Sequence, residues 1–353
     1  MAIAGNRRVG QSRARAVPRP TIYDVAHKAR VSPATVSKVL RGVTTVSREN
    51  TERVNEAVQE LGYRSDPLAA NLRRNKRALV GLIIPDFKNP FFGALVASIE
   101  RLAEDSGFRL VAVSSSESAK KEKAQIEALL DWRVGGMILI PSTGELTSAA
   151  RLREEAIPAV ILDRVPPASA FDGVGVDNAE ACGAMVRHFY DLGHRRLLVA
   201  GSSPDLPNMA ERLAGLRNAA ASLPQPMDIE ILYCGADMDS ANRTMAGRFA
   251  KAPLPTAVFA LYIQGTLAAL REIGARNLTI PDDISIAGFD DFEWMQVMHP
   301  PVATVIQPID DLARAAWAQL LHRIDHPHGK RQRTQLSCRI EYRGSIAEFR
   351  PGG

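Results

Sequence analysis

From Leu79 onward the sequence alternates short apolar runs with segments of helical pattern, and this alternation limits the fold more than any other feature. Runs that are apolar along their whole length are typical of parallel strands, because helices cover both faces of such sheets. Ten runs are too many for one compact half, so we expect two doubly wound α/β subdomains with a cleft between them. The runs are LVGLIIP, RLVAVSS, GGMILIP, AVILDR, GVGVD, RLLVAG, EILYCG, AVFALY, DISIAGFD and ATVIQP.

The ends of these runs carry the side chains that a ligand would meet. Ligands of open α/β sheets bind beyond the carboxyl ends of the strands. Aromatic faces cover the apolar face of a sugar ring, and carboxylates, amides and guanidiniums suit its hydroxyls, since buried polar groups need partners. The candidates at these positions are Asn89, Phe91, Phe92, Asp163, Arg164, Arg212, Asp290 and Gln307.

The N-terminal stretch TIYDVAHKARVSPATVSKVLRG, residues 21–42, predicts two short helices joined by a three-residue turn. Thr21 is placed as the N-cap of the first helix, with Asp24 in a capping-box position. The apolar face of this helix has the spacing i, i+3, i+4, i+7 and consists of Ile22, Val25, Ala26 and Ala29.

Two more helices follow the same rules. Ser32 caps the second helix and Pro33 stands at its first position, where a missing N–H has no cost. Its inward residues are Val36, Val39 and Leu40. Ser47 caps a third helix, whose apolar side is formed by Val54, Ala57, Val58 and Leu61. The first two helices have helix-turn-helix spacing, which predicts that the second enters the major groove of DNA.

The charge distribution agrees with a nucleic-acid partner for the N-terminal part alone. Residues 1–77 contain 16 Lys and Arg against 6 Asp and Glu, whereas the remainder contains 28 against 33. A basic module on a mildly acidic body indicates that only the module meets a polyanion. Residues 1–20 read as a basic disordered arm without a secretory signal, and no apolar run could span a bilayer. Three widely spaced cysteines fit a reducing cytoplasm, which is where we expect the protein.

Residues 21–74 closely resemble the DNA-binding headpiece of the LacI/GalR family of bacterial transcription regulators. The motifs DVA, VSxxTVSxVL and ELGY carry the resemblance, which covers the headpiece without a gap. It implies that Pro33, Ala34 and Lys38 read bases, with Lys38 reaching guanine acceptors and the other two making apolar contacts. It also implies a set of phosphate-contacting or orienting residues, namely Thr21, Tyr23, Ser32, Thr35, Ser37 and Asn50.

The next segment, SDPLAANLRRNKR, resembles the hinge helix of the same family. Such a helix is too short to be stable alone in water and orders on DNA. The resemblance implies that two copies enter the minor groove, where Leu72 wedges open the central base step with Arg73 beside it.

The remaining chain resembles the periplasmic-binding-protein-like effector domain of this family, and more narrowly the ribose-binding proteins. The eight strand-end residues occur in the order found around the pocket of those proteins, which implies a monosaccharide, with a pentose such as ribose favoured. One segment departs from the pattern. VFALYIQGTLAAL is shorter than its usual counterpart, and no Ser, Thr, Asn or Asp after Ala260 can cap the helix. We expect a distorted turn and a pocket that lacks one polar wall.

Signals for other chemistry are weak. His322, His326 and His328 lie close together but fall in a loop with Pro327 and Gly329, so no metal site is predicted. We find no set of nucleophile, base and orienting residue, and expect neither enzymatic activity nor a cofactor.

The sequence therefore predicts an effector-controlled DNA-binding regulator, most consistent with a repressor of carbohydrate metabolism genes. We expect a homodimer on a pseudo-palindromic operator, because no C-terminal leucine heptad indicates a tetramer. Two alternatives remain: a regulator with a non-sugar effector or none, and a solute-binding transport protein.

The expected segments are an arm (1–20), a headpiece (21–66), a hinge (67–78), an effector domain (79–345) and a tail (346–353). Within the effector domain, the N-subdomain comprises 79–179 and 308–328, and the C-subdomain comprises 180–307 and 332–345.

Overall fold

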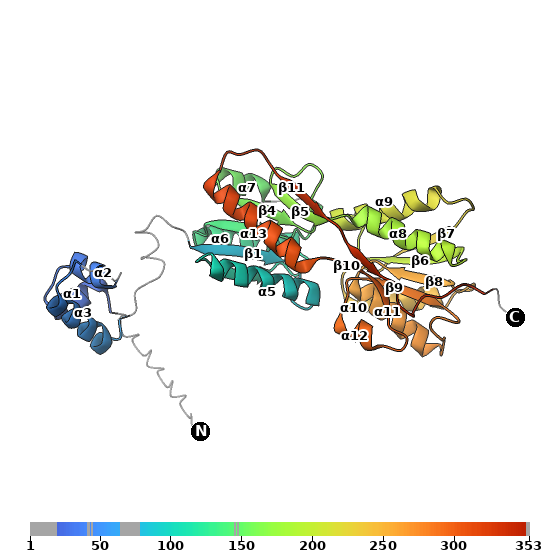
Figure 1. The fold of residues 1–353 in the computed structure, drawn as a ribbon, viewed down its shortest axis with the longest axis horizontal. Coiled ribbons are helices and arrows are strands. Elements are labelled where there is room, and N and C mark those ends of the chain that lie inside the picture. The colour runs from blue at the N-terminus through green and yellow to red at the C-terminus, as the bar shows by residue number, and fades with distance from the viewer. Residues whose placement is uncertain are drawn as a thin grey trace, which may run out of the picture. The chain divides into compact units, whose positions relative to one another are not determined.

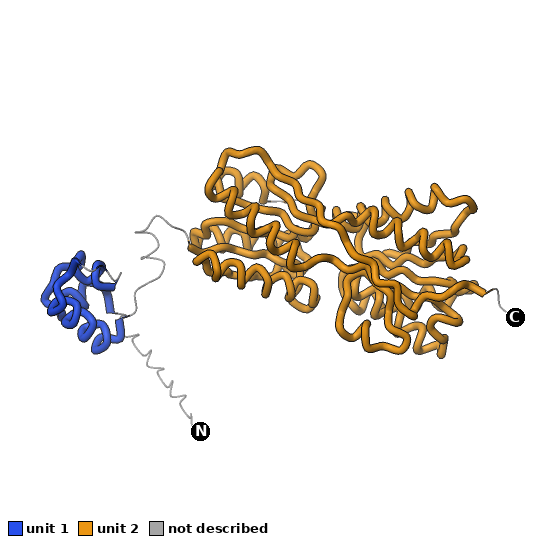
Figure 2. The backbone as a smooth tube through the Cα atoms, viewed as in Figure 1, with its two compact units in different colours: residues 1–76 blue, residues 77–353 orange. Residues whose placement is uncertain are grey.

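The structure is a computed structural model that describes residues 20–40, 43, 45–63, 78–144, 146 and 148–350. The chain divides into two compact units, residues 1–76 and residues 77–353, which Figure 2 shows in different colours. Each unit buries apolar side chains of its own, as expected of a separate domain.

The described part of the first unit contains three helices, α1 (Ile22–Ala29), α2 (Pro33–Leu40) and α3 (Arg48–Leu61). Each begins at the cap that the sequence predicted. Thr21 and Asp24 form a reciprocal capping box. The hydroxyl of Ser32 accepts a hydrogen bond from the Thr35 N–H at 3.1 Å, and Ser47 accepts one from the Asn50 N–H at 3.4 Å. These bonds satisfy N–H groups that a helix start leaves free.

The three helices share a small core. Its buried members are Val25, Ala26, Ala29, Val36, Val54 and Ala57, and Ile22, Val39, Val58 and Leu61 pack against it. The predicted apolar faces are thereby confirmed, with one exception. Leu40 was expected to face inward, but 39% of its surface is exposed. It is the last residue of α2, where three short helices leave the end of the apolar face uncovered.

The second unit consists of two subdomains, each built on a six-stranded sheet (Figure 1). In the first sheet all neighbouring strands are parallel, in the order β11-β5-β4-β3-β1-β2. Its strands are β1 (Leu79–Ile84), β2 (Arg109–Ser114), β3 (Gly136–Leu139), β4 (Ala159–Leu162), β5 (Asp172–Val176) and β11 (Arg333–Leu336). Its helices are α5 (Pro90–Asp105), α6 (Ala119–Asp131), α7 (Ala149–Glu154) and α13 (Ile309–Asp325).

The second sheet has the order β12-β10-β9-β8-β6-β7, and β12 alone runs antiparallel to its neighbour. Its strands are β6 (Arg196–Gly201), β7 (Asp228–Tyr233), β8 (Ala257–Ala260), β9 (Ser285–Phe289), β10 (Ala303–Ile306) and β12 (Arg339–Glu341). Its helices are α8 (Asn178–Asp191), α9 (Pro207–Ala221), α10 (Met238–Phe249), α11 (Ile263–Ala275) and α12 (Glu293–Val297). The ten predicted runs and the two doubly wound subdomains are thus confirmed.

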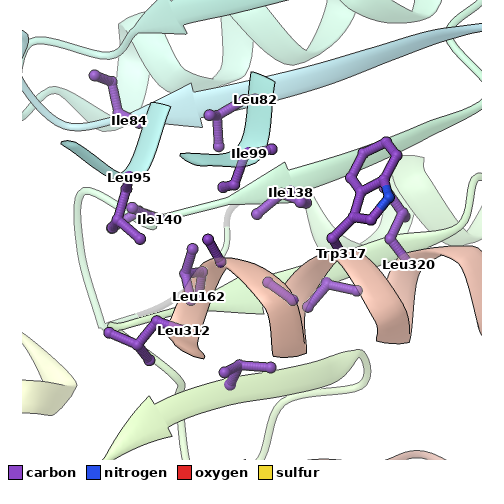
Figure 3. Packing of buried hydrophobic residues seen from close by; sticks show 14 of the residues in the cluster. Leu82, Ile84, Leu95, Ile99, Ile138, Ile140, Leu162, Leu312, Trp317 and Leu320 are labelled. Carbon is purple, nitrogen blue, oxygen red and sulfur yellow. The ribbon is translucent and has the colours of Figure 1, made fainter. Parts of the chain in front are cut away.

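Packing on both faces of the sheets explains why central strands such as β1, β3, β4 and β8 are apolar throughout. Leu82 and Ile84 point to one face of the first sheet, where they pack with residues of α5 and α13, including Leu95 and Trp317 (Figure 3). Ile83, between them in sequence, belongs to the cluster on the opposite face. Because successive strand residues alternate between faces, both must be apolar when helices cover both.

The chain crosses between the subdomains three times, from β5 to α8, from β10 to α13 and from β11 to β12. The third crossing corrects the expected boundary. Residues 332–345 were all placed in the C-subdomain, but β11 pairs with β5 in the first sheet, and only β12 belongs to the second. Both are short strands at the edge of their sheets, so their sequences carry no buried apolar pattern that reveals their neighbours. None of the described helices combines the length and the apolar composition needed to cross a membrane.

Candidate functional site

A cavity lies between the two subdomains, at the carboxyl ends of their strands, and the structure brings all eight predicted pocket residues to it. They are Asn89, Phe91, Phe92, Asp163, Arg164, Arg212, Asp290 and Gln307. Further lining residues that the sequence did not single out include Asp86, Glu117, Ser202, Asn208, Tyr262 and Gln264. The arrangement follows the rule that placed the candidates, because strand ends of both sheets converge on the same space.

The start of α5 forms the aromatic part of the lining. Asn89 is the N-cap, and its Oδ1 accepts a hydrogen bond from the Phe91 N–H at 3.0 Å. Phe91 and Phe92 are both buried and meet edge to face with ring centroids 5.3 Å apart. Asn89 therefore lines the cavity and also caps α5. The cap holds the backbone that carries the two aromatic rings.

The residues after β4 form a charged part of the lining. Asp163 adopts a positive φ of 63°, and both Asp163 and Arg164 are buried. The Arg164 guanidinium donates to Glu117, with Nη1 2.7 Å from Oε2 and Nη2 2.8 Å from Oε1, and to the Pro141 carbonyl at 3.0 Å. Sequence reasoning missed Glu117, although it lies three residues after the end of β2 and the strand-end rule applies to it as well.

Arg212 on α9 contacts three other segments on the C-subdomain side of the cavity. Its Nε donates to Asn178 Oδ1 at 2.8 Å and its Nη1 donates to the Leu261 carbonyl at 2.6 Å. The guanidinium carbon lies 3.4 Å from the centroid of the Phe289 ring, a close cation–π contact. Arg212 thus ties the first crossing segment to the turn after β8.

Asp290 and Gln307 form a pair at the ends of β9 and β10. Gln307 Nε2 donates to Asp290 Oδ1 at 2.7 Å, and Asp290 adopts a positive φ of 72°. Burial raises the pKa of Asp290 to about 6, although nearby Arg212 and the Gln307 amide act in the opposite direction. Burial likewise raises the pKa of Asp163, against the attraction of Arg212 and Arg164. Both carboxyls are held in surroundings that disfavour their charge.

A hydrogen bond joins the two subdomains across the cavity. Asn208 Nδ2, on α9 of the second subdomain, donates to Asp163 Oδ2 of the first at 3.0 Å. The other carboxylate oxygen, Asp163 Oδ1, is buried without a hydrogen-bond partner in the part of the chain that the structure describes, as are Gln307 Oε1 and Arg164 Nε. Buried polar atoms seldom stay unpaired, so these atoms indicate a polar ligand.

The turn after β8 lacks a capping side chain, as the sequence predicted, but the expected loss of a polar wall is incomplete because Gln264 at the start of α11 lines the cavity. Tyr262 is the residue before α11, and no side chain caps this helix. The Tyr262 hydroxyl instead donates to the Gly235 carbonyl at 2.9 Å, and its ring packs against Gly265. An aromatic ring therefore occupies this part of the cavity wall.

In the first unit, the predicted base-reading residues Pro33, Ala34 and Lys38 are all exposed on α2. Tyr23, one of the predicted phosphate contacts, is 71% exposed, while Thr35, Ser37 and Asn50 are half-buried. Thr21 and Ser32 are exposed, and both side chains also act as helix caps. The predicted minor-groove residues Leu72 and Arg73 lie outside the described residues.

Two family models match the chain. The family described as bacterial regulatory proteins, lacI family, matches residues 21–66, and the periplasmic binding protein-like domain matches residues 186–346. The HTH-type transcriptional regulator KdgR of Bacillus subtilis is 30% identical over 337 residues, which cover 92% of this chain and 97% of that protein.

Solved structures show the same relationship. The Lac repressor dimer bound to operator and the anti-inducer ONPF is 25% identical, with a TM-score of 0.80, covering 94% of this chain and 100% of that one. A LacI family transcriptional regulator from Enterococcus faecium with bound ribose is also 25% identical, with a TM-score of 0.70, covering 77% of this chain and 100% of that one.

Proposed function

The chain belongs to the lacI family of bacterial regulatory proteins and is a DNA-binding transcription regulator, and from this premise we propose that it is a sugar-controlled repressor of carbohydrate metabolism genes. Its effector is a monosaccharide, with a pentose such as ribose favoured. One observation carries the proposal: eight side chains from both subdomains, selected by their place at strand ends, meet at a single cavity that contains unpartnered buried polar atoms.

The DNA contacts divide into two classes. Lys38, Pro33 and Ala34 are exposed on the second helix of the helix-turn-helix and read base edges in the major groove. Tyr23, Thr35, Ser37 and Asn50, with the cap residues Thr21 and Ser32, position the unit on phosphates. Leu72 and Arg73 enter the minor groove. Because each chain supplies one such unit, a homodimer on a pseudo-palindromic site is the assembly.

Control by the effector follows from a shift between two populations. The hydrogen bond from Asn208 to Asp163 joins the subdomains and is made only when they lie close together. An effector that binds one arrangement better than the other changes their ratio, and operator affinity follows if the two arrangements bind DNA differently.

The pocket chemistry supports a sugar. Phe91 and Phe92 offer aromatic surface to the carbon face of a ring, while Asp163, Asp290 and Gln307 offer acceptors to its hydroxyls. The structure with bound ribose agrees with this class of ligand, which comes to this chain by similarity alone. A regulator with a less polar effector is the alternative, and the Tyr262 ring in the wall favours it.

The test is selection from a library of palindromic duplexes by the full chain at one fixed salt concentration, because DNA affinity depends steeply on salt. The selected duplex is then titrated with and without a panel of monosaccharides that includes ribose. One palindrome whose affinity changes with one sugar supports the whole proposal and gives the sign of the response. A palindrome that is indifferent to every sugar retains the regulator and rejects the sugar effector. Failure to select any duplex rejects the DNA contacts.

A further inference from the structure

Glu117 occupies the end of the Arg164 guanidinium that its two terminal nitrogens form, one of the places where this group could receive an anion. The two side chains form a bidentate pair at 2.7 and 2.8 Å, and only 8% of the Arg164 side chain and 26% of the Glu117 side chain are exposed. Such fork-to-fork pairs are among the strongest charge-assisted hydrogen bonds in proteins. Pro141 accepts from Nη1 as well, and Nε, which makes no hydrogen bond within the described residues, lies 4.0 Å from Asp163 Oδ2.

The loop after β2 holds Glu117 in this position. Its backbone N–H donates to the Pro85 carbonyl at 3.2 Å, and Ser116 donates to the Ser114 hydroxyl at 3.0 Å. Ser116 and Glu117 both have positive φ angles, of 50° and 53°. Residues without glycine's freedom seldom adopt this conformation, and when they do the surrounding structure must hold them there. The Glu117 carboxylate is therefore a fixed part of the cavity wall.

The second guanidinium of the cavity is occupied too. Arg212 donates to Asn178 and to the Leu261 carbonyl and lies against the Phe289 ring. Both arginines thus already donate to acceptors of the protein, and the Glu117 carboxylate balances the charge of Arg164, so a phosphate would have to compete with these partners.

Acceptors are in excess in the same cavity. Four carboxylates line it, from Asp86, Glu117, Asp163 and Asp290, against two guanidiniums. The unpartnered oxygens are Asp163 Oδ1 and Gln307 Oε1, each on a residue that is 5% exposed. These atoms call for O–H donors from the ligand, whereas an anion brings further acceptors and like charge.

We infer that Glu117 is a specificity-determining residue, whose carboxylate occupies Arg164 as a built-in anion and restricts the pocket to uncharged, free sugars while excluding their phosphate esters. This inference rests on the sugar pocket of the proposed function and adds a residue and a ligand charge to it. It also implies that the effector is the sugar as it stands before phosphorylation in a reaction sequence. Phosphorylation, in which a sugar hydroxyl takes the γ-phosphoryl group of a nucleoside triphosphate and releases the diphosphate and a proton, converts the effector into a form that the pocket rejects.

The experiment is calorimetric titration of the full chain with monosaccharides and their monophosphate esters, with ribose and ribose 5-phosphate as the first pair. For the wild type we expect the ester to bind at least ten-fold more weakly than the free sugar. Glu117→Gln removes the negative charge and one of the two acceptors beside the guanidinium and keeps the side-chain shape. For this variant we expect the dissociation constant of the ester, divided by that of the free sugar, to fall by at least ten-fold.

Two further variants isolate the cause. Glu117→Asp keeps the charge, so we expect no gain in ester binding. Glu104→Gln removes an exposed carboxylate that pairs with Arg109 at 3.1 Å in the same subdomain, and we expect it to leave the ratio unchanged. Circular dichroism and thermal melting report whether each variant is folded. The ratio of the two dissociation constants for the wild type tests the inference even if a variant does not fold.

The outcomes separate this inference from the proposed function. Free sugar that binds no better than its ester to the wild type, or a ratio that Glu117→Gln does not move, overturns the role of Glu117 and leaves the sugar pocket intact. A wild type that binds no sugar and no ester of the panel overturns both. An ester that binds only to Glu117→Gln supports the inference directly.

Discussion

Asn208 donates a hydrogen bond to Asp163 across the cavity, with Nδ2 3.0 Å from Oδ2, and so links a helix of one subdomain to the strand end of the other. Both residues are buried. An intramolecular hydrogen bond contributes roughly 0.5–1.5 kcal/mol. This bond therefore favours the arrangement in which the two subdomains lie close together.

Asn208→Ala removes this link and leaves one more Asp163 oxygen without a partner. We expect the subdomains to separate more readily and the affinity for the effector to fall by about three- to ten-fold, which is roughly 1 kcal/mol. Titration with the sugar that the library experiment identifies measures the change. Asn218→Ala is the matched control, because Asn218 is exposed on the same helix. Equal affinities for the wild type and Asn208→Ala would show that the link does not contribute to closure.

Asp290→Asn should stabilise the protein at neutral pH and abolish its response to the effector. Burial raises the pKa of Asp290 from 3.8 to about 6 in the folded chain. Between these values the folded state holds the proton more firmly than the unfolded state, so the free energy of unfolding falls as pH rises from about 4 to about 6 and stays lower above that. The asparagine lacks this penalty, which is up to about 3 kcal/mol.

Thermal unfolding of both proteins at a series of pH values from 4 to 8 checks this expectation. The difference in Tm should be small near pH 4, grow up to about pH 6 and then remain constant. Asp311→Asn is the control, because this carboxylate is exposed and pairs with Arg314 on α13. A difference in Tm that does not change with pH would mean that the charge of Asp290 is not the cause.

Lys38→Ala tests the assignment of bases to the second helix. Lys38 is exposed on α2, and loss of a base contact costs roughly 1–3 kcal/mol at one position of the site. We expect ten-fold or weaker binding to the selected palindrome and a relaxed preference at one base pair in each half-site. Repeating the library selection with the variant measures both effects.

Lys28→Ala is the control for this experiment, because Lys28 lies on α1 and pairs with Glu60 on α3. It should leave the preferred sequence unchanged. If Lys38→Ala instead weakens binding equally for all sequences and lowers the salt dependence, Lys38 contacts a phosphate and does not read a base.

The parts of the fold that could be predicted are those whose signal is local. β1 and β8 are apolar throughout because helices cover both faces of their sheets, and this pattern is visible in the sequence itself. β11 and β12 lie at sheet edges and have polar sequences, RTQL and RIE. Their partners, β5 and β10, are far away in the chain, so the subdomain to which each belongs could not be predicted.

The site shows the same division. Asp163 and Asp290 follow apolar strands, so the strand-end rule and the family resemblance both selected them. Asn208 contacts Asp163, which lies 45 positions away, and no local pattern reveals this contact. Glu117 could have been selected because it follows β2, but its pairing with Arg164, 47 positions away, could not be predicted locally. The uncapped start of α11 was visible as a missing cap residue, whereas the hydrogen bond from Tyr262 to Gly235 depends on the packing of two separate loops.

Gly144→Ala should hold the subdomains apart without touching the polar groups of the cavity. A Cβ atom at Gly144, which follows β3 in the first subdomain, would lie 2.5 Å from the backbone carbonyl oxygen of Asp205 in the second. Such a contact with a backbone atom is far below the van der Waals distance, so the backbone at Gly144 or at Asp205 must shift, and the contact opposes the approach of the two subdomains. We expect at least ten-fold weaker binding of the effector and a larger radius of gyration by small-angle X-ray scattering.

Gly93→Ala is the matched control for this change. Gly93 lies on α5 of the same subdomain, and a Cβ atom there would have no neighbour within 4 Å, so the substitution should leave both measurements unchanged. The two variants also separate closure from the chemistry of the pocket. If Gly144→Ala enlarges the protein but binds the effector as the wild type does, the effector does not require the closed arrangement, and the link from Asn208 to Asp163 cannot transmit its binding. If affinity falls together with compactness, closure and binding are one event, and any change that favours closure should raise the affinity for the effector.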